Sequence, residues 1–97
     1  MIRSFGDLAT EDLYHGRQTS RVRHFPQTIV PAALRKLDMI NAAHELADLR
    51  VPPGNRLEPL KGALEGYHSI RINDQWRIVF HWENGGADKV AIKDYHY

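Results

Sequence analysis

The chain has 97 residues and a net charge of +1, and its 42% hydrophobic and 26% charged residues predict one soluble globular domain over residues 1–97. The absence of cysteine excludes disulfides, thiolate metal sites and cysteine nucleophiles, and no histidines show metal-ligand spacing, so we expect neither a metal nor another cofactor. No apolar run approaches the roughly 20 residues that cross a bilayer, and a signal-peptide pattern is missing, which predicts a cytoplasmic protein without a membrane partner.

The N-terminal half of the chain predicts a strand and then helices. Residues 1–5 are rich in apolar side chains and predict the first strand. Thr10 is a suitable N-cap for a short helix that ends near Gly16, because its hydroxyl can accept a bond from a free backbone N–H. Pro26 and Pro31 bracket the start of the next helix. Asn41 is a plausible cap for a further helical turn, and both a kinked helix and two consecutive helices fit the pattern.

A basic segment spans the end of the first predicted helix and most of the second. Between residues 13 and 37 there is no acidic side chain, whereas five side chains are basic: Arg17, Arg21, Arg23, Arg35 and Lys36. Such clustering on a nearly neutral protein is typical of a surface that contacts an anionic partner. A solvated helix face is the alternative that charge alone leaves open.

Beyond residues 51–55, where proline and glycine end the helices, the hydrophobic period changes from helix to strand. Residues 67–73 and 76–82 alternate between apolar and polar, residues 90–92 start a similar pattern, and residues 73–75 and 84–86 suit hairpin turns. Trp76 and Trp82 share the phase of the apolar residues and are expected in the core. The predicted fold is a two-layer α+β domain: an N-terminal strand, two or three helices, and an antiparallel meander with the helices on one sheet face.

Strand alternation then predicts what the other sheet face carries. If Ile70, Ile78 and Ile92 pack under the helices, Arg71, Arg77 and their neighbours point away from them. The complete set on this face is Tyr67, Ser69, Arg71, Arg77, His81, Lys93 and Tyr95. Guanidinium groups on neighbouring strands suit a phosphate, and tyrosine or histidine beside them can transfer protons, which is the chemistry of RNA cleavage. An exposed sheet face that is merely solvated is the competing interpretation.

Three segments of this chain resemble the HigB-type killer proteins, toxins of bacterial type II toxin–antitoxin systems in the RelE/ParE superfamily. They are residues 55–62 (Asn-Arg-Leu-Glu-Pro-Leu-Lys-Gly), 66–78 and 94–96 (Asp-Tyr-His). The most specific parts are Asn-Asp-Gln-Trp-Arg at residues 73–77 and the terminal Asp-Tyr-His. The resemblance implies a RelE-like fold and a metal-independent endoribonuclease that cuts mRNA in the ribosomal A site. It also implies a HigA-type helix-turn-helix antitoxin, through which the toxin is linked indirectly to operator DNA.

The resemblance also implies roles for single residues. Arg77 would stabilise the charge on the phosphate and Lys61 would assist it, while Asp94, Tyr95 and His96 would supply proton transfer and base contacts. Arg71 and Arg56 would bind RNA, and we expect Arg17, Arg21 and Arg23 to contact ribosomal RNA. Glu58 departs from the family pattern, since some members carry a catalytic histidine there. Three consequences fit: Glu58 is the general base, His96 takes that role, or the activity is weak.

Two other functions remain compatible with the sequence. Relatives on the ParE side of the superfamily act without catalysis, by binding gyrase, although the ending Asp94-Tyr95-His96 argues against this. An inactive homologue that only pairs with a DNA-binding antitoxin and tunes repression is the second alternative.

Overall fold

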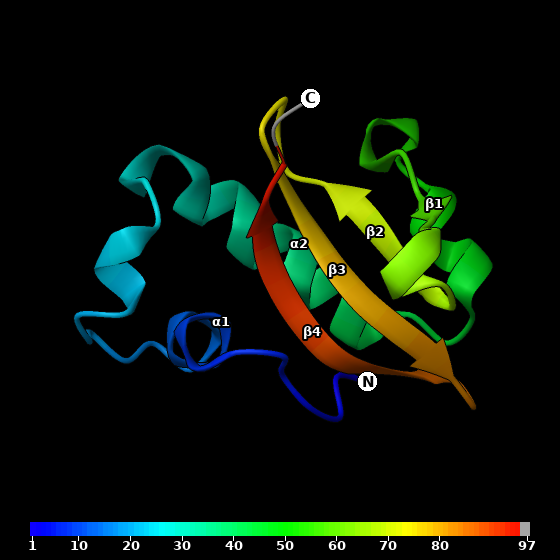
Figure 1. Ribbon diagram of the computed structural model, residues 1–97, viewed down its shortest axis with the longest axis horizontal. Coiled ribbons are helices and arrows are strands. Elements are labelled where there is room, and N and C mark those ends of the chain that lie inside the picture. The colour runs from blue at the N-terminus through cyan, green and yellow to red at the C-terminus, as the bar shows by residue number, and fades with distance from the viewer. Residues whose placement is uncertain (96–97) are drawn as a thin grey trace.

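The C-terminal half of the chain forms an antiparallel sheet of four strands in the order β1-β2-β3-β4 (Figure 1). The strands are β1 (Glu58–Pro59), β2 (Tyr67–Arg71), β3 (Trp76–Glu83) and β4 (Gly86–Asp94). This computed structural model describes residues 1–95. The meander and both of its hairpin turns were predicted by the alternation of residues 67–92, and the α+β class is confirmed.

Two α-helices, α1 (Leu8–Tyr14) and α2 (Val30–Ala42), lie on one side of the sheet, with α2 crossing behind the strands in Figure 1. The connections contain 3-10 turns η1 (Val22–His24), η2 (Gln27–Ile29), η3 (Leu46–Arg50), η4 (Pro53–Asn55) and η5 (Gly62–Leu64). Within residues 1–95, no helix combines the length and apolar character needed to span a membrane. For the second predicted helix, both a kinked helix and two consecutive helices fitted the sequence. The structure shows one α-helix, α2, followed by the separate 3-10 turn η3.

The core lies between α2 and the inner face of the sheet. Leu37 and Ile40 of α2 are fully buried against Ile70, Ile78 and Phe80 of the central strands. Trp76 and Trp82 pack against the edge of this core, as their phase predicts. Burial of these side chains fixes the phase of each strand, and so it decides which residues reach the opposite face.

The N-terminal segment adds to the free edge of β4 rather than forming a regular strand. It pairs in parallel with β4 through two isolated bridges, Ile2 to Ala87 and Phe5 to Val90. Asn41, the predicted helix cap, instead accepts a bond from the backbone N–H of Ile2 at 2.9 Å. This contact joins the end of α2 to the start of the chain.

Thr10 is also not the cap of the first helix. Asp7 caps α1, since its carboxylate accepts a bond from the backbone N–H of Thr10 at 2.7 Å. The Thr10 side chain is fully buried, and its hydroxyl accepts a bond from the backbone N–H of Ile92 at 2.9 Å. The hydroxyl thus fastens α1 to β4, a contact across 82 residues that local sequence cannot indicate.

Candidate functional site

Three basic side chains form a row across the sheet on the face turned away from α2. Arg71 of β2 lies directly opposite Arg77 of β3, and Arg77 lies opposite Lys93 of β4. Residues that pair directly across antiparallel strands project from the same face. The alternation of the sequence therefore predicted this row correctly. We call Arg71, Arg77 and Lys93 the cationic row.

Arg77 is buried in the centre of the row, with only 5% of its surface exposed. Its Nε donates to the hydroxyl of Ser69 at 2.7 Å, and its Nη2 donates to the main-chain carbonyls of Arg56 at 2.6 Å and of Ser69 at 3.3 Å. A guanidinium that merely solvates a sheet surface is exposed, so this competing interpretation is wrong for Arg77. The fixed contacts leave Nη1 without a partner among residues 1–95.

The carbonyl of Arg56 reaches Arg77 because the backbone at Arg56 is left-handed, with φ 46° and ψ 55°. This conformation follows η4 and turns the chain into β1. The Arg56 side chain itself is exposed. Residue 56 therefore contributes a main-chain acceptor, which side-chain reasoning from the sequence did not include.

Glu58 brings a carboxylate close to Arg77. It pairs with Ser69 across β1 and β2, and its Oε1 lies 3.6 Å from Nη2 of Arg77. Because about half of the Glu58 side chain is exposed, the carboxylate also faces solvent. Arg77 and Glu58 thus place an anion-binding group and a proton acceptor side by side.

These residues line an open hollow of about 520 Å³. Its wall is formed by residues of β1 and the segment before it, of β2 and β3, and of the β2–β3 turn: Arg56, Leu57, Glu58, Arg71, Asn73, Asp74 and Arg77. Arg71 is one-third exposed and forms an ion pair with Asp74. Three of the seven lining residues are arginines, so the hollow has the charge and the donors to hold a phosphate.

The C-terminal residues divide between the two sides of the sheet. Tyr95 follows Lys93 in the alternation, and its backbone N–H donates to the carbonyl of Gln75 at 2.6 Å, which ties it to the β2–β3 turn beside the hollow. Asp94 instead pairs with Trp76 and accepts a bond from the Gln75 amide at 3.1 Å, so it lies on the face opposite Arg77. His96 lies outside the described residues.

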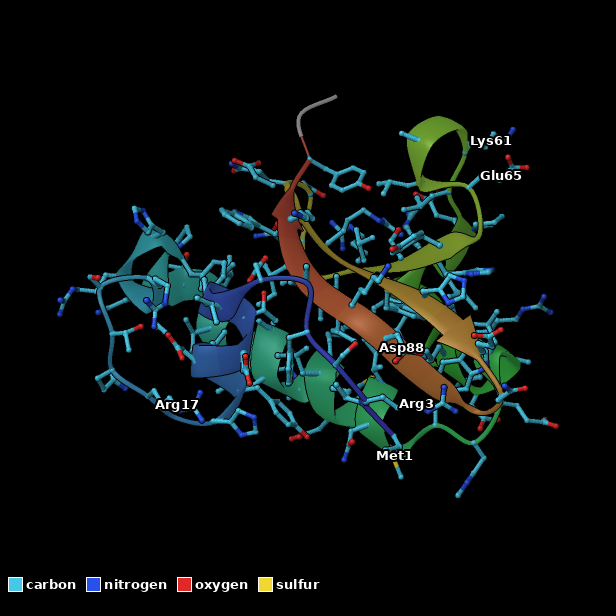
Figure 2. All side chains as sticks on the ribbon, turned by 60° about the horizontal axis from the view of Figure 1, so that its bottom comes forward. Met1, Arg3, Arg17, Lys61, Glu65 and Asp88 are labelled. Carbon is cyan, nitrogen blue, oxygen red and sulfur yellow. The ribbon has the colours of Figure 1, made fainter. Side chains whose placement is uncertain are left out.

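Lys61 does not line the hollow. It directly precedes η5, is exposed, and extends from the outer edge of the molecule beside Glu65 (Figure 2). A lysine side chain is long and flexible, but the structure does not bring this one to Arg77. Its expected role in binding phosphate is therefore a prediction that the fold leaves unsupported.

The basic segment near the N-terminus lies far from the hollow, and Figure 2 shows Arg17 at the opposite end of the view from Lys61. Arg21 and Arg17 form ion pairs with the buried carboxylate of Asp12, at 2.9 and 3.3 Å. A hydrogen bond from the hydroxyl of Thr19, followed by the two arginines, lowers the pKa of Asp12.

Residues 17–21 of this segment form a loop, whereas Arg35 and Lys36 lie on α2, so the solvated-helix interpretation does not apply to Arg17 and Arg21. Arg17 and Arg21 are instead partly neutralised by a residue just before the segment, which leaves Arg23 without an ion-pair partner among residues 1–95.

Sequence reasoning missed three features of the site. Ser69 was expected on this face without a role, and Asn73 and Asp74 of the hairpin turn were expected only as turn residues. The alternation of β2 already gives Ser69 and Arg71 the same face, so the signal was present for Ser69. Within residues 1–95, no three His, Cys, Asp or Glu side chains are grouped as a metal ion would require.

Solved structures share this arrangement of helices and sheet. A chain of the YoeB–YefM complex from Staphylococcus aureus superposes with a TM-score of 0.61 and 22% identity. The match covers 100% of the present chain and 99% of the chain in that complex. YafQ from E. coli matches 97% of this chain and 93% of its own, with a TM-score of 0.56 and 14% identity. These likenesses establish that the fold is that of the YoeB and YafQ class of proteins.

Sequence comparison identifies the family. Residues 3–96 match the family of RelE-like toxins of the type II toxin–antitoxin system HigB, and the chain belongs to this family. Toxin HigB-1 of Vibrio cholerae serotype O1 is 40% identical over the full length of both chains. Endoribonuclease HigB of Proteus vulgaris is 36% identical over 99% of this chain and all of its own. The resemblance that the three sequence segments indicated is confirmed.

Proposed function

We propose that this toxin is an endoribonuclease that cleaves mRNA on the ribosome and acts in the cytoplasm. The observation that carries the proposal is Arg77, a buried guanidinium whose Nε and Nη2 are fixed by Ser69 and Arg56 while Nη1 has no partner among the described residues. A rigidly held cation is the group that stabilises charge developing on a phosphate. The name of the Proteus vulgaris relative supports an RNA substrate.

The reaction that fits these groups begins with the 2′-hydroxyl of the substrate. Its oxygen forms a bond to the adjacent phosphorus and gives its proton to the carboxylate of Glu58, which stands beside Arg77. The bond from phosphorus to the 5′-oxygen breaks, and that oxygen takes a proton from an acid. The products are a 2′,3′-cyclic phosphate and a 5′-hydroxyl. Arg77 stabilises the added negative charge on the phosphate oxygens.

We further propose Tyr95 or His96 as the source of that proton. Tyr95 is supported by its attachment to the β2–β3 turn, which lines the hollow. Asp94 is the weaker candidate because it lies on the opposite face, and it would act through its bond to Gln75. Arg71 and Arg56 would hold the RNA backbone, with Lys61 and Arg23 available at its periphery.

The family implies an antitoxin partner. We propose that it is a HigA-type helix-turn-helix protein that neutralises the toxin and links it to operator DNA. The complex of YoeB with YefM supports partnership as a property of this fold, since that toxin-like chain is seen with a second protein.

The test is cleavage of mRNA on programmed ribosomes, with the 5′ ends of the fragments mapped. We expect cuts in the A-site codon by the wild-type protein and a loss of about 100-fold or more in Arg77→Lys, because the lysine cannot bond Ser69, Arg56 and a phosphate together. Arg50→Lys, at an exposed arginine of η3, is the matched control. Circular dichroism verifies that each variant is folded.

The outcomes separate three functions. Loss of cleavage in Arg77→Lys alone supports the proposal, whereas a loss below threefold removes Arg77 from the catalytic groups. Toxicity with DNA damage and intact mRNA would favour a toxin that binds gyrase. Normal growth during overexpression, with repression of an operon in the presence of the antitoxin, would favour an inactive co-repressor.

A further inference from the structure

The sheet face that carries Arg77 has opposite charges at its two ends. The cationic row crosses one end. At the other end, an open hollow of about 450 Å³ is lined by three carboxylates, from Glu65, Glu83 and Asp88, against one ammonium group, from Lys89, and by the ring pair Tyr67 and His81. The acidic end lies four residues along the strands from the cationic row, which is about 13 Å at the usual rise per residue. An RNA backbone that ran along the strands would bring its phosphates to these carboxylates.

A bulge in β4 sets this distribution of charge. The pairing shifts between Val79, which lies opposite Ala91, and His81, which lies opposite Asp88. Lys89 sits in the bulge with a positive φ of 55°. Without the extra residue, regular pairing would put Lys89 opposite His81. The bulge therefore puts Asp88 rather than Lys89 opposite His81, while Lys89 still lines the hollow.

Within the cationic row, the three residues differ in how their charge is compensated. Arg71 has an ion pair with Asp74, and Arg77 has one with Glu58 at 3.6 Å. Lys93 is exposed and has no ion-pair partner among residues 1–95. Like charges directly opposite each other on neighbouring strands destabilise a sheet. The pair of Arg77 and Lys93 therefore favours an anion that both can reach.

We propose that Lys93 binds the RNA phosphate next to the scissile one, so that the RNA backbone crosses the strands from β3 onto β4. This inference rests on the proposed function, and it adds a second phosphate site that no role assigned above includes. The Cβ atoms of directly opposed side chains lie about 5 Å apart. From that separation a flexible lysine reaches the neighbouring phosphate while Arg77 holds the reacting one. A lysine suits this position because the second phosphate needs a charge and no fixed geometry.

The test is binding of a fluorescein-labelled RNA pentanucleotide in which every 2′-hydroxyl is methylated, so that no linkage can be cleaved. Affinity is measured by anisotropy between about 20 and 150 mM salt. Each phosphate contact contributes roughly 0.7 to the slope of log K against log salt for single strands. We expect Lys93→Gln to reduce the slope by about 0.7. Lys89→Gln, an exposed lysine of the same strand at the acidic end, is the matched control and should leave the slope unchanged.

A second arm locates the phosphate. A neutral methylphosphonate replaces the linkage on either side of the scissile phosphate in turn. We expect the wild type to lose affinity at one of these positions, and Lys93→Gln to show no further loss there, because the contact is already absent. Equal losses in the two proteins at both positions would overturn the proposal, and so would equal slopes for Lys93→Gln and Lys89→Gln.

Arg77→Lys separates this inference from the proposed function. If the wild type binds RNA and Arg77→Lys binds it more weakly, while Lys93→Gln behaves as the wild type, the second phosphate site alone is refuted. If neither the wild type nor Arg77→Lys binds the pentanucleotide at low salt, the second phosphate site is refuted, while cleavage of mRNA on programmed ribosomes still decides the proposed function.

Discussion

Replacing Ser69 with alanine removes a hydroxyl that orients the Arg77 side chain. Ser69 is fully buried, and its Oγ accepts the Nε–H of Arg77 at 2.7 Å. Hydrogen bonds to charged groups contribute roughly 1.5–3 kcal/mol, and the larger values apply where the buried donor is left with no partner at all. Two carbonyls still hold Nη2 in the variant. We therefore expect a loss of about 1.5 kcal/mol in the free energy of unfolding.

The effect on cleavage should exceed the effect on stability. Without the bond to Nε, the guanidinium can rotate about its remaining contacts, and displacements on the order of 1 Å reduce catalysis by up to about 100-fold. We expect the rate at saturating ribosomes to fall about tenfold to 100-fold. The ribosome concentration that gives half of the maximal rate should change little, because Arg71 and Lys93 still face the RNA.

Cleavage of programmed ribosomes by Ser69→Ala, Ser69→Thr and Ser20→Ala measures this effect. Threonine restores a hydroxyl and should recover most of the rate, while Ser20 is an exposed loop residue and its variant should match the wild type. Urea denaturation gives the stability of each protein separately. A Ser69→Ala variant that is less stable but cleaves at the wild-type rate would refute the positioning role.

Three further predictions concern stability. Asn55→Ala should lower the free energy of unfolding, measured by urea denaturation, by about 3 kcal/mol. The fully buried Asn55 amide donates to the Leu49 carbonyl and accepts from the Lys36 ammonium. A loss below about 1 kcal/mol would contradict this. Asp12 has a pKa below its usual 3.8, so its contribution is present above that pH and declines below it; Asp12→Asn should lower the melting temperature more at pH 7 than at pH 3. Burial, and next the nearby His81, lower the pKa of His68 below 6.5, so the wild type should lose stability as the pH falls through 6.5, and His68→Phe should flatten this dependence in thermal melts.

The cationic row was predictable from sequence because a strand has a period of two. Once burial of Ile78 fixes the phase of β3, Arg77 must point to the other face. Antiparallel pairing through the short turn at residues 73–75 then brings Arg71 opposite Arg77. These are local rules, and the structure follows them.

The surroundings of Arg77 could not be predicted in the same way. Its contact with the Arg56 carbonyl spans 21 residues and depends on a left-handed backbone that an arginine rarely adopts. The pairing of Arg17 and Arg21 with Asp12 similarly depends on how a loop folds back on α1. No helical or strand period relates such positions.

The sequence by itself determined the helices before the meander, the faces of its strands β2 to β4 and the family, because hydrophobic periodicity and short motifs are local properties of a chain. Only the tertiary structure decided that Arg77 is buried and anchored, that Glu58 is its neighbour and that Lys61 is not. Those outcomes depend on where loops are carried when the core closes. The contacts of loop residues follow the packing of distant segments rather than their own sequence.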